Sequence, residues 1–460
     1  MAVVFDILYL LAAPAVGLFL AIKSLRTGKY RSDWAARFGR YPKTPRAENA
    51  DATHLPRRIL LHCVSVGELL SMRFLIDKLL AADPDLQIIL TTTTDTGTAR
   101  ARELYGTPDA PKPPGRVLTY RYPIDLSCAV RGFLNHTRPD LIALVELETW
   151  PNFIYIAHAR RIPIVILNGR LTERSGKRYR LIYTIMAGML HRIAWLGIQT
   201  RTIADRFTAL GASPDRITIL PTLKYDSADL SDTIPGADAL AAACGIAPDH
   251  ILFVAGSTGP GEETALLETY LALRTRYPAL RLAIAPRKPE TVPQTIAAIT
   301  ASNLTPLLRT DHPDAPTPQC LIASVPQCLS PNDVLLLNTL GELKKLYARA
   351  SFVFVGRSLI PLGGSDMIEV AALAKPCCFG PHTQNFTEAV ELLLKENAAI
   401  QLPNAAALTP ALESWLANPA AARDLGQRAR AVIAAQRGST DRYVARLLTF
   451  LPPPETKKQK

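Results

Sequence analysis

The sequence predicts an α/β protein built from two Rossmann-like domains with a cleft between them. The chain has 460 residues, more than the roughly 250–300 residues at which a single hydrophobic core stops growing. Short apolar runs alternate with amphipathic helical stretches, the pattern of a parallel sheet covered by helices on both faces. Residues 226–249 break this rhythm with Pro, Gly and Asp. We interpret them as a linker between an N-terminal domain (31–225) and a C-terminal domain (250–450).

The expected strands fall into two series. The first series reads "RILLHCVSV", "QIILTTTT", "LIALVELET", "IPIVILNGR", "WLGIQT" and "RITILPTL". The second series, after the linker, reads "HILFVAGST", "LRLAIAPRK", "DVLLLNTLG", "ASFVFVG" and "KPCCFG". The Pro-rich residues 306–331 are expected to form an exposed loop or edge connection, and residues 451–460 a loose basic tail.

Residues 1–30 predict a membrane anchor with a basic flank. The segment Ile7–Ile22 is uncharged and is followed by Lys23, Arg26, Lys29 and Arg31. Sixteen helical residues span roughly 24 Å, short of the ~30 Å hydrocarbon core. A cleaved signal peptide fits poorly because its positive charge would precede the apolar run. We therefore expect an uncleaved anchor, spanning or half-inserted, that keeps the rest of the chain on the cytoplasmic face of the membrane.

Composition narrows the class of partner. Lys and Arg total 52 against 40 Asp and Glu, a formal charge of +12, which favours anionic partners. No arginine-rich run or zinc-type spacing supports nucleic acid as that partner. The seven cysteines are odd in number and scattered, as expected for reduced, packed thiols in a cytosolic compartment.

Acidic residues follow the strands of the N-terminal half. Glu68 follows one apolar run, Glu146 and Glu148 end another, and Arg170 follows a third. An acid at such a turn is often a helix-N-terminus residue that gains about 0.3–1 kcal/mol from the helix dipole. A proton acceptor is the alternative, because ligands bind at the carboxyl ends of strands in open α/β sheets. His62 and His382 are interpreted as structural, and GxSxG and Walker-type motifs are missing from the sequence.

Small residues follow the strands of the C-terminal half instead. Three strand-to-helix junctions read "AGSTGPGEE", with Ser257 and Thr258, "PLGGSDMIE", with Gly363 and Gly364, and "FGPHTQNF". Helix N-termini offer unpaired N–H groups that can hold a phosphate or a carboxylate. Acids in one half and anion-binding turns in the other indicate group transfer, in which the C-terminal half holds a phosphate-linked donor and the N-terminal half deprotonates an acceptor.

The motifs, in order, resemble those of the 3-deoxy-D-manno-octulosonic acid (Kdo) transferase family. They are "HCVSVGE", "VELETWPN", "NGRLTERS", "LKYD", "AGSTGPGEE", "APRKPE", "TLGELKKLYARASFVFVG", "GG–MIEVAALAKP" and "FGPHTQNF". The resemblance covers nearly the whole chain. It implies a GT-B fold and inverting transfer of Kdo from CMP-Kdo to a primary hydroxyl of a lipid A precursor in lipopolysaccharide biosynthesis. It also implies that neither a catalytic metal nor a cofactor takes part.

The resemblance assigns roles by position. Glu68 becomes the general base, Glu146, Glu148 and Lys224 stabilise the transition state, and Arg170 contacts the acceptor. Besides Ser257, Thr258, Gly363 and Gly364, the donor contacts fall on Pro286, Arg287, Leu340, Gly341, Glu342, Asp366, Met367, Ile368 and Glu369.

The sequence departs from the family pattern in the donor half. Ser365-Asp366-Met367 replaces the usual His-Asn-Pro, and an acid near a phosphate is repulsive unless Asp366 turns toward the backbone or a ribose. Lys288 replaces the usual His, Asn338 the usual Asp, and Pro221-Thr222 the usual Gly-Asn. Two alternatives stay open: an anchored lipid A-binding protein with a decayed donor site, and an enzyme related to UDP-sugar epimerases.

Overall fold

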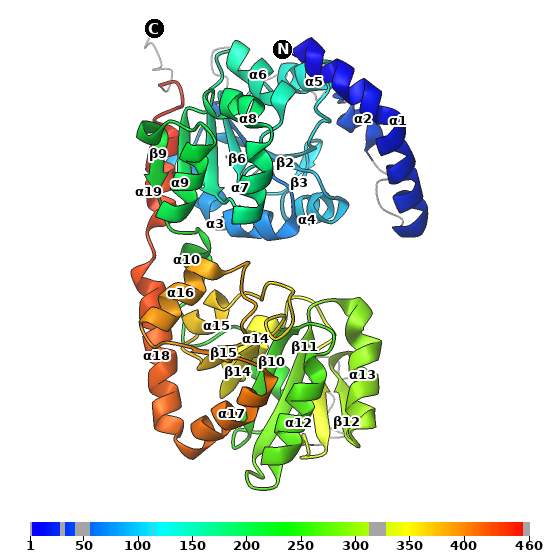
Figure 1. The fold of residues 1–460 in the computed structure, drawn as a ribbon, viewed down its shortest axis with the longest axis vertical. Helices are drawn as coiled ribbons and strands as arrows, with labels where there is room; N and C mark the ends of the chain where they lie inside the picture. The colour runs from blue at the N-terminus through cyan, green and yellow to red at the C-terminus, as the bar shows by residue number, and fades with distance from the viewer. Residues whose placement is uncertain (1, 28–32, 42–55, 114, 312–327, 454–460) are drawn as a thin grey trace. The chain divides into compact units, whose positions relative to one another are not determined.

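The computed structural model describes residues 2–27, 33–41, 56–113, 115–311 and 328–453. The chain divides into two compact units (Figure 1). Unit 1 comprises Met1–Ser227 together with Gly438–Lys460, and unit 2 comprises Ala228–Arg437. Lys29 and Arg31 of the expected basic flank, and most of the expected tail, lie outside the described residues.

Unit 1 is built on a seven-stranded parallel sheet. Its order across the sheet is β5 (Val117–Arg121), β2 (Gln87–Thr92), β1 (Arg58–Cys63), β6 (Leu141–Val145), β7 (Ile164–Gly169), β8 (Trp195–Ile198) and β9 (Ile217–Ile219). After β1 the chain builds the sheet in one direction and then returns to place β6 on the other side. The order therefore reverses between β1 and β6, which makes their carboxyl ends the topological switch point.

Helices cover both faces of this sheet. The first core contains Ile59, Leu61, Met72 and Tyr443, and the second contains Leu60, Phe133, Phe153 and Phe207. Successive β1 residues thus enter opposite cores, which explains why the buried strands read as unbroken apolar runs. The helices are α2 (Trp34–Arg37), α3 (Val66–Ala82), α4 (Asp95–Tyr105), α5 (Ser127–Thr137), α6 (Pro151–Ala159), α7 (Glu173–Arg180), α8 (Tyr183–Leu190), α9 (Arg201–Ala209), α10 (Lys224–Ser227) and α19 (Ser439–Leu448). A short hairpin, β3 (Gly106–Thr107) with β4 (Ala110–Pro111), follows α4.

Unit 2 has a parallel sheet of the same size. Its order is β12 (Thr305–Leu308), β13 (Asp333–Leu336), β11 (Leu280–Pro286), β10 (Ile251–Thr258), β14 (Phe352–Val355), β15 (Cys377–Phe379) and β16 (Ile400–Gln401). The order reverses between β10 and β14, so unit 2 also has a switch point at the carboxyl ends of two neighbouring strands. Its helices are α11 (Ala237–Ala243), α12 (Glu262–Arg274), α13 (Val292–Ala301), α14 (Leu343–Arg349), α15 (Ile368–Ala372), α16 (Thr387–Lys395), α17 (Leu408–Ala417) and α18 (Pro419–Ala435).

Three segments differ from the sequence-based expectation. Residues 228–249, expected within the linker, belong to unit 2, where α11 packs against α14. Residues 438–450, expected in the second domain, belong to unit 1, where α19 packs against α3. Strand β12 occupies the start of the Pro-rich stretch, of which residues 312–327 lie outside the described residues.

The N-terminal helix α1 (Ala2–Thr27) packs against α5 and α6 of unit 1 (Figure 1). Phe5 is buried and its ring stacks on Tyr155 of α6 with the centroids 6.0 Å apart. A carboxylate oxygen of Asp6 accepts a hydrogen bond from the backbone N–H of Ser127, 2.9 Å away, at the start of α5. Tyr9 donates a 2.7 Å hydrogen bond to Asp125. Within the described part of the chain, no helix has the length and apolar content needed to cross a bilayer.

Candidate active site

Glu68 lies in the first turn of α3, directly after β1. Ser65 is the N-cap of this helix, and its hydroxyl accepts from the backbone N–H of Glu68 and donates to Glu68 Oε1 at 3.0 Å. The other carboxylate oxygen, Oε2, accepts from the backbone N–H of Val64 at 2.8 Å. Ser65 and Glu68 thus match the S-x-x-E sequence of a capping box, with the difference that Glu68 reaches back to the N–H of Val64 and not to that of the N-cap residue Ser65. The sequence analysis missed this pattern, although both residues are visible in "SVGE".

The same carboxyl has a strongly shifted pKa. Burial is the main cause, and the nearby charges of Glu146 and Glu148 add to it, so that the pKa of Glu68 rises from 4.5 to about 7. The hydrogen bonds from Val64 and Ser65 act in the opposite direction, because they favour the ionised form. A carboxyl with this pKa can gain and lose a proton near neutral pH, as a general base must.

Glu146 and Glu148 follow β6, the neighbour of β1 at the switch point. Glu146 has a φ of 61°, in the left-handed region that non-glycine residues seldom adopt. Such strain is costly and concentrates at functional sites. Glu148 accepts a 3.4 Å hydrogen bond from the indole N–H of Trp150, and burial followed by the charge of Glu146 raises the pKa of Glu148. The structure therefore brings together the three acids that the sequence analysis singled out.

The remaining candidates of unit 1 lie on other elements. Arg170 follows β7, the next strand after β6. Lys224 begins α10, which packs against α3, the helix that carries Glu68. Tyr179 of α7 was missed by the sequence analysis, and the pKa of its hydroxyl is raised by burial and then by the charge of Glu148. This coupling indicates that α7 borders the acid cluster.

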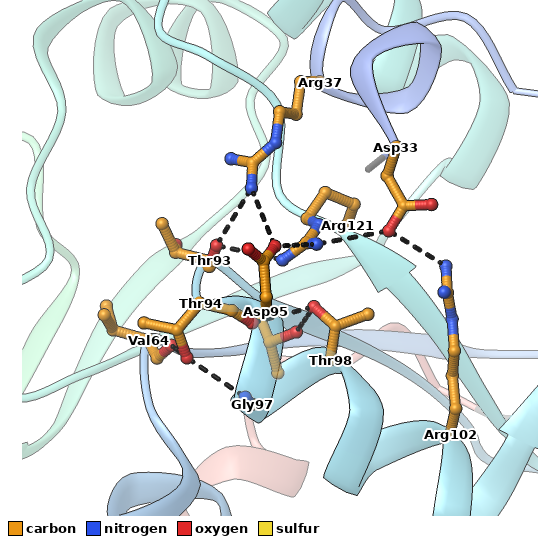
Figure 2. A network of polar contacts seen from close by, with 11 residues as sticks. Asp33, Arg37, Val64, Thr93, Thr94, Asp95, Gly97, Thr98, Arg102 and Arg121 are labelled. Atoms are coloured by element: carbon orange, nitrogen blue, oxygen red, sulfur yellow. Dashed lines mark hydrogen bonds and ion pairs between the residues drawn. The ribbon is translucent and has the colours of Figure 1, made fainter. Parts of the chain in front are cut away.

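A network of charged and hydroxyl side chains supports the turn at Val64, which precedes Glu68 in the chain (Figure 2). The carbonyl oxygen of Val64 accepts two hydrogen bonds from Thr94, one from its N–H and one from Oγ1, both at 3.1 Å. The next residue, Asp95, pairs with the buried Arg121 at 2.5 Å. Arg121 also contacts Asp33, 3.2 Å away, in the segment before α2. The turn before the candidate base is thus tied to α4, β5 and α2.

In unit 2 the turns after β10 and β14 are joined by Glu262. This residue is 1% exposed. Its Oε1 accepts from the N–H groups of Ser358 and Leu359, at 2.8 and 2.9 Å, and its Oε2 accepts from those of Gly259 and Arg357, at 2.8 and 2.6 Å. At the first junction the N–H group of Gly259 is therefore bound by an internal carboxylate and is not offered to a ligand.

The Gly363–Gly364 turn adopts the backbone geometry that its glycines permit, with φ values of 85° and 80°. Ser365 is buried and donates to the carbonyl oxygen of Ser257 at 3.3 Å, which joins this turn to the end of β10. Asp366 accepts from the backbone N–H of Ile368 at 3.0 Å. The acid that replaces the usual family residue thus turns toward the backbone, one of the two arrangements that avoid repulsion of a phosphate.

Tyr347 of α14 lies among several expected donor residues. Burial raises the pKa of this hydroxyl, the charges of Glu369 and Asp366 raise it further, and Arg287 lowers it. A Cβ atom on Gly256 would lie only 1.9 Å from the Tyr347 hydroxyl oxygen, so glycine is required there. The structure therefore brings Arg287, Asp366 and Glu369 into one electrostatic neighbourhood centred on a residue that the sequence analysis missed.

The other expected donor residues differ in what they can present to a ligand. Met367 and Ile368 are buried, so contacts from them would come from the backbone. Leu340 is 83% exposed beside Gly341, which has a φ of 88°. Glu342 forms a 3.2 Å ion pair with Arg309. Ser257 has a φ of 55°, Thr258 is buried beside it, and Pro286 ends β11.

Comparison with solved structures shows the same fold. A UDP-GlcNAc 2-epimerase from Neisseria meningitidis bound to UDP-GlcNAc matches with a TM-score of 0.57 and 11% identity, over 85% of this chain and 100% of that one. A glycosyltransferase from Rickettsia africae matches with a TM-score of 0.56 and 11% identity, over 86% and 98% of the two chains. At this identity the likeness shows the fold alone, the α/β architecture expected of a GT-B protein.

Comparison of sequences is more specific. A family described as 3-deoxy-D-manno-octulosonic-acid transferase matches residues 32–227. A 3-deoxy-D-manno-octulosonic acid transferase from Haemophilus influenzae is 29% identical over 445 residues, which cover 96% of this chain and 97% of that protein. Its counterpart from Bordetella pertussis is 30% identical over 444 residues, 95% of this chain and 97% of that protein. On this evidence the chain belongs to the 3-deoxy-D-manno-octulosonic acid transferase family of glycosyltransferases.

Proposed function

We propose that the chain transfers Kdo from CMP-Kdo to a primary hydroxyl of a lipid A precursor, with inversion at the anomeric carbon. Glu68 takes the proton of the acceptor hydroxyl while its oxygen forms a bond to the anomeric carbon. The bond from that carbon to the CMP phosphate breaks, and CMP leaves with the electron pair. Inversion in one displacement needs one base and no covalent nucleophile.

The observation that carries this proposal is the raised pKa of Glu68 at the switch point of unit 1. A pKa of about 7 is close to the pH at which a general base works best. Each carboxylate oxygen accepts one hydrogen bond from Ser65 or Val64 and has a second lone pair with which to accept the substrate proton. The hydrogen bonds from Val64 and Ser65 therefore orient the base and leave it able to react.

Lys224, Glu146 and Glu148 are proposed to stabilise the transition state. A compact ammonium such as that of Lys224 offsets the charge that develops on the departing phosphate. The carboxylates of Glu146 and Glu148 suit the positive charge that develops on the sugar ring. Arg170, which follows the neighbouring strand β7, is proposed to contact the acceptor.

The donor is proposed to bind at the switch point of unit 2. Arg287, Asp366 and Glu369 are coupled to Tyr347 there, and Ser365 joins the Gly363–Gly364 turn to β10. Arg287 would pair with the CMP phosphate and Glu369 would accept hydrogen bonds from the ribose. The remaining expected donor contacts, at Ser257, Thr258, Pro286 and residues 340–342, surround the same strand ends.

Membrane attachment through α1, at the cytoplasmic face of the inner membrane, is part of the proposal. Val3, Val4, Ile7, Leu8 and Leu11 are exposed, whereas Phe5, Asp6 and Tyr9 contact unit 1. This two-sided arrangement favours the half-inserted alternative, in which α1 lies in the interface and the exposed side meets lipid. Attachment there would keep the enzyme beside a glycolipid acceptor.

The test is a detergent assay with CMP-Kdo and lipid A precursor, run on wild type, Glu68→Gln and the control Glu103→Gln. We expect wild type and the control to transfer Kdo, and Glu68→Gln to lose about 10²–10⁴ in kcat. Binding of CMP-Kdo by wild type without turnover would favour the lipid-binding alternative. Turnover of a soluble UDP-sugar without lipid would favour the epimerase alternative. A Glu68→Gln variant that keeps most of the rate would remove the base assignment and leave the family unchanged.

A further inference from the structure

An exposed apolar turn follows helix α7. Leu181 is 86% exposed, Ile182 44% and Tyr183 50%. Large apolar side chains in soluble proteins are scattered singly over the surface, and consecutive exposed ones indicate a contact with another apolar phase or partner. With the cations Arg174, Lys177, Arg178 and Arg180 of α7, these residues define what we call the α7–α8 patch.

The turn is held in a defined conformation, so its exposure is not the result of a missing internal contact. The N–H of Leu181 donates to the carbonyl oxygen of Arg178, and that of Ile182 to the carbonyl oxygen of Tyr179, each at 3.1 Å. Tyr179 before the turn packs against the core of unit 1, and Met186 after it is buried within that core. Neighbouring residues thus fill the interior, and residues 181–183 are left to face outward.

Positive charge surrounds this apolar turn. Arg174, Lys177, Arg178 and Arg180 lie on α7 together with one acid, Glu173, which pairs with Lys177 at 2.7 Å. A hollow of about 160 Å³ is lined by Lys177, Arg180 and Arg206, with Glu173, Gly176 and Leu210. Arg206 is held there by a 2.8 Å hydrogen bond to the carbonyl oxygen of Leu171. Three cations against one carboxylate give the hollow a positive balance that suits a phosphate group.

The patch and the N-terminal helix pack on the same helix of unit 1. Helices α1 and α8 both contact α6. Tyr155 of α6 stacks on Phe5 of α1, and the guanidinium of Arg192, just after α8, lies 4.3 Å from the centre of the same ring. The exposed apolar side chains of α1 and those of the turn are therefore attached to a common support.

We infer that the α7–α8 patch is a second membrane-contact element, in which Leu181–Tyr183 enter the bilayer interface and the α7 cations bind anionic phospholipid head groups. Apolar side chains next to cations match an anionic bilayer, which offers acyl chains and negative charge together. A second copy of this chain fits less well, since it carries a formal charge of +12 and would bring like charge to the patch. The inference goes beyond the proposed transfer chemistry and does not depend on it.

Vesicle binding of the full chain tests this inference. On vesicles that contain phosphatidylglycerol, we expect Arg174→Ser/Arg178→Ser to lower the partition coefficient by about tenfold and Leu181→Ser by about fivefold. Matched controls are Lys395→Ser/Arg423→Ser, which removes two exposed charges elsewhere, and Ile219→Ser, which removes an exposed apolar side chain (41%) from β9. The charge effect should vanish on pure phosphatidylcholine and at high salt.

A second measurement separates the patch from α1. In Leu181→Trp, brominated lipids should quench fluorescence beyond the level seen with wild type, because the new indole enters the interface. Vesicle-bound Leu181→Trp without added quenching would overturn the inference. So would patch variants that bind vesicles normally but raise KM for the lipid A precursor in detergent, or that dissociate a dimer. Unchanged detergent turnover in the patch variants is expected, and it keeps this test distinct from that of the proposed function.

Discussion

Thr94 donates two hydrogen bonds to the carbonyl oxygen of Val64, one from its N–H and one from its Oγ1, each 3.1 Å long. The N–H of Val64 in turn donates to Glu68. Thr94 is also the N-cap of the neighbouring helix α4, because its Oγ1 accepts from the N–H of Gly97. Val64, which binds the candidate base, is therefore held in place by the start of α4. Position and protonation of Glu68 should therefore depend on Thr94.

For Thr94→Val we expect kcat to fall by about tenfold. The carbonyl oxygen of Val64 loses the hydrogen bond from Thr94 Oγ1, and the carboxylate of Glu68, which binds Val64 N–H, is then less firmly positioned. Loss of an N-cap alone costs about 1 kcal/mol of stability. The control is Thr200→Val, which removes the equivalent cap of α9 and should lower stability equally while leaving kcat unchanged. Thr94→Ser keeps the hydroxyl and should retain both the wild-type kcat and the wild-type stability. Equal kcat values for the two valine variants would exclude a positioning role.

The pH dependence of the rate should follow the ionisation of Glu68. With a pKa of about 7, the carboxyl is protonated in acid and acts as a base only when ionised. We expect kcat/KM to rise tenfold per pH unit below pH 7 and to level off above it, and the residual rate of Glu68→Gln to lack this step. A wild-type midpoint near 4.5 would contradict the raised pKa.

Stability should show the opposite trend with pH. The pKa of Glu68 is higher in the folded chain than the ordinary value of 4.5, so folding binds a proton, and the free energy of unfolding falls as pH rises from about 4.5 to 7. Glu68→Gln removes the ionisable group and with it this pH-dependent loss of stability. Measured by denaturant unfolding, its stability relative to wild type should increase by on the order of 2 kcal/mol across that interval. A stability difference between the two proteins that does not change with pH would contradict a raised pKa for Glu68.

Glu262 should be far more important to stability than its neighbours on α12. Its carboxylate accepts four backbone hydrogen bonds, and an amide oxygen in Glu262→Gln could replace only some of them while its NH₂ group would face N–H donors. We expect a loss of at least about 3 kcal/mol and weaker CMP binding. The exposed Glu268 on the same helix provides the control, because Glu268→Gln should change neither quantity.

Lys224→Ala should reduce turnover more than donor affinity. An ammonium that offsets the charge of the leaving phosphate contributes mainly in the transition state, so kcat should fall by about 10²–10³ with little change in the Kd for CMP-Kdo. Single-turnover rates and equilibrium titration with the donor would separate the two effects. A change confined to Kd would assign Lys224 to ground-state binding instead.

The strands and the acid cluster could be predicted from the sequence because both depend on local pattern. Strands β1, β2, β6 and β7 coincide with apolar runs that are buried on both faces. Glu68, Glu146 and Glu148 follow strands β1 and β6, and parallel strands place their carboxyl ends at one edge. Strand β5 was missed because "VLTYR" carries a charged residue, Arg121, which is buried through its pairs with Asp95 and Asp33.

Long-range partnerships could not be predicted in the same way. Nothing local to Glu262 indicates that its carboxylate reaches a turn almost a hundred residues later. Asp226 of "LKYD" likewise accepts from the N–H groups of Gly438 and Thr440, at 2.6 and 2.5 Å, and so caps α19. The amphipathic pattern of α19 predicts a helix, but it does not say that the helix packs on α3.

The return of α19 to unit 1 has a consequence for how the protein is made. The backbone N–H of Asn168 donates a 3.0 Å hydrogen bond to the hydroxyl oxygen of Tyr443 in α19, and the Tyr443 ring packs on Trp195. During synthesis the ribosome must therefore finish all of unit 2 before this helix emerges. Until α19 is made, the side of α3 on which it packs stays uncovered in the nascent chain. A chaperone can bind that exposed side of α3 during this time.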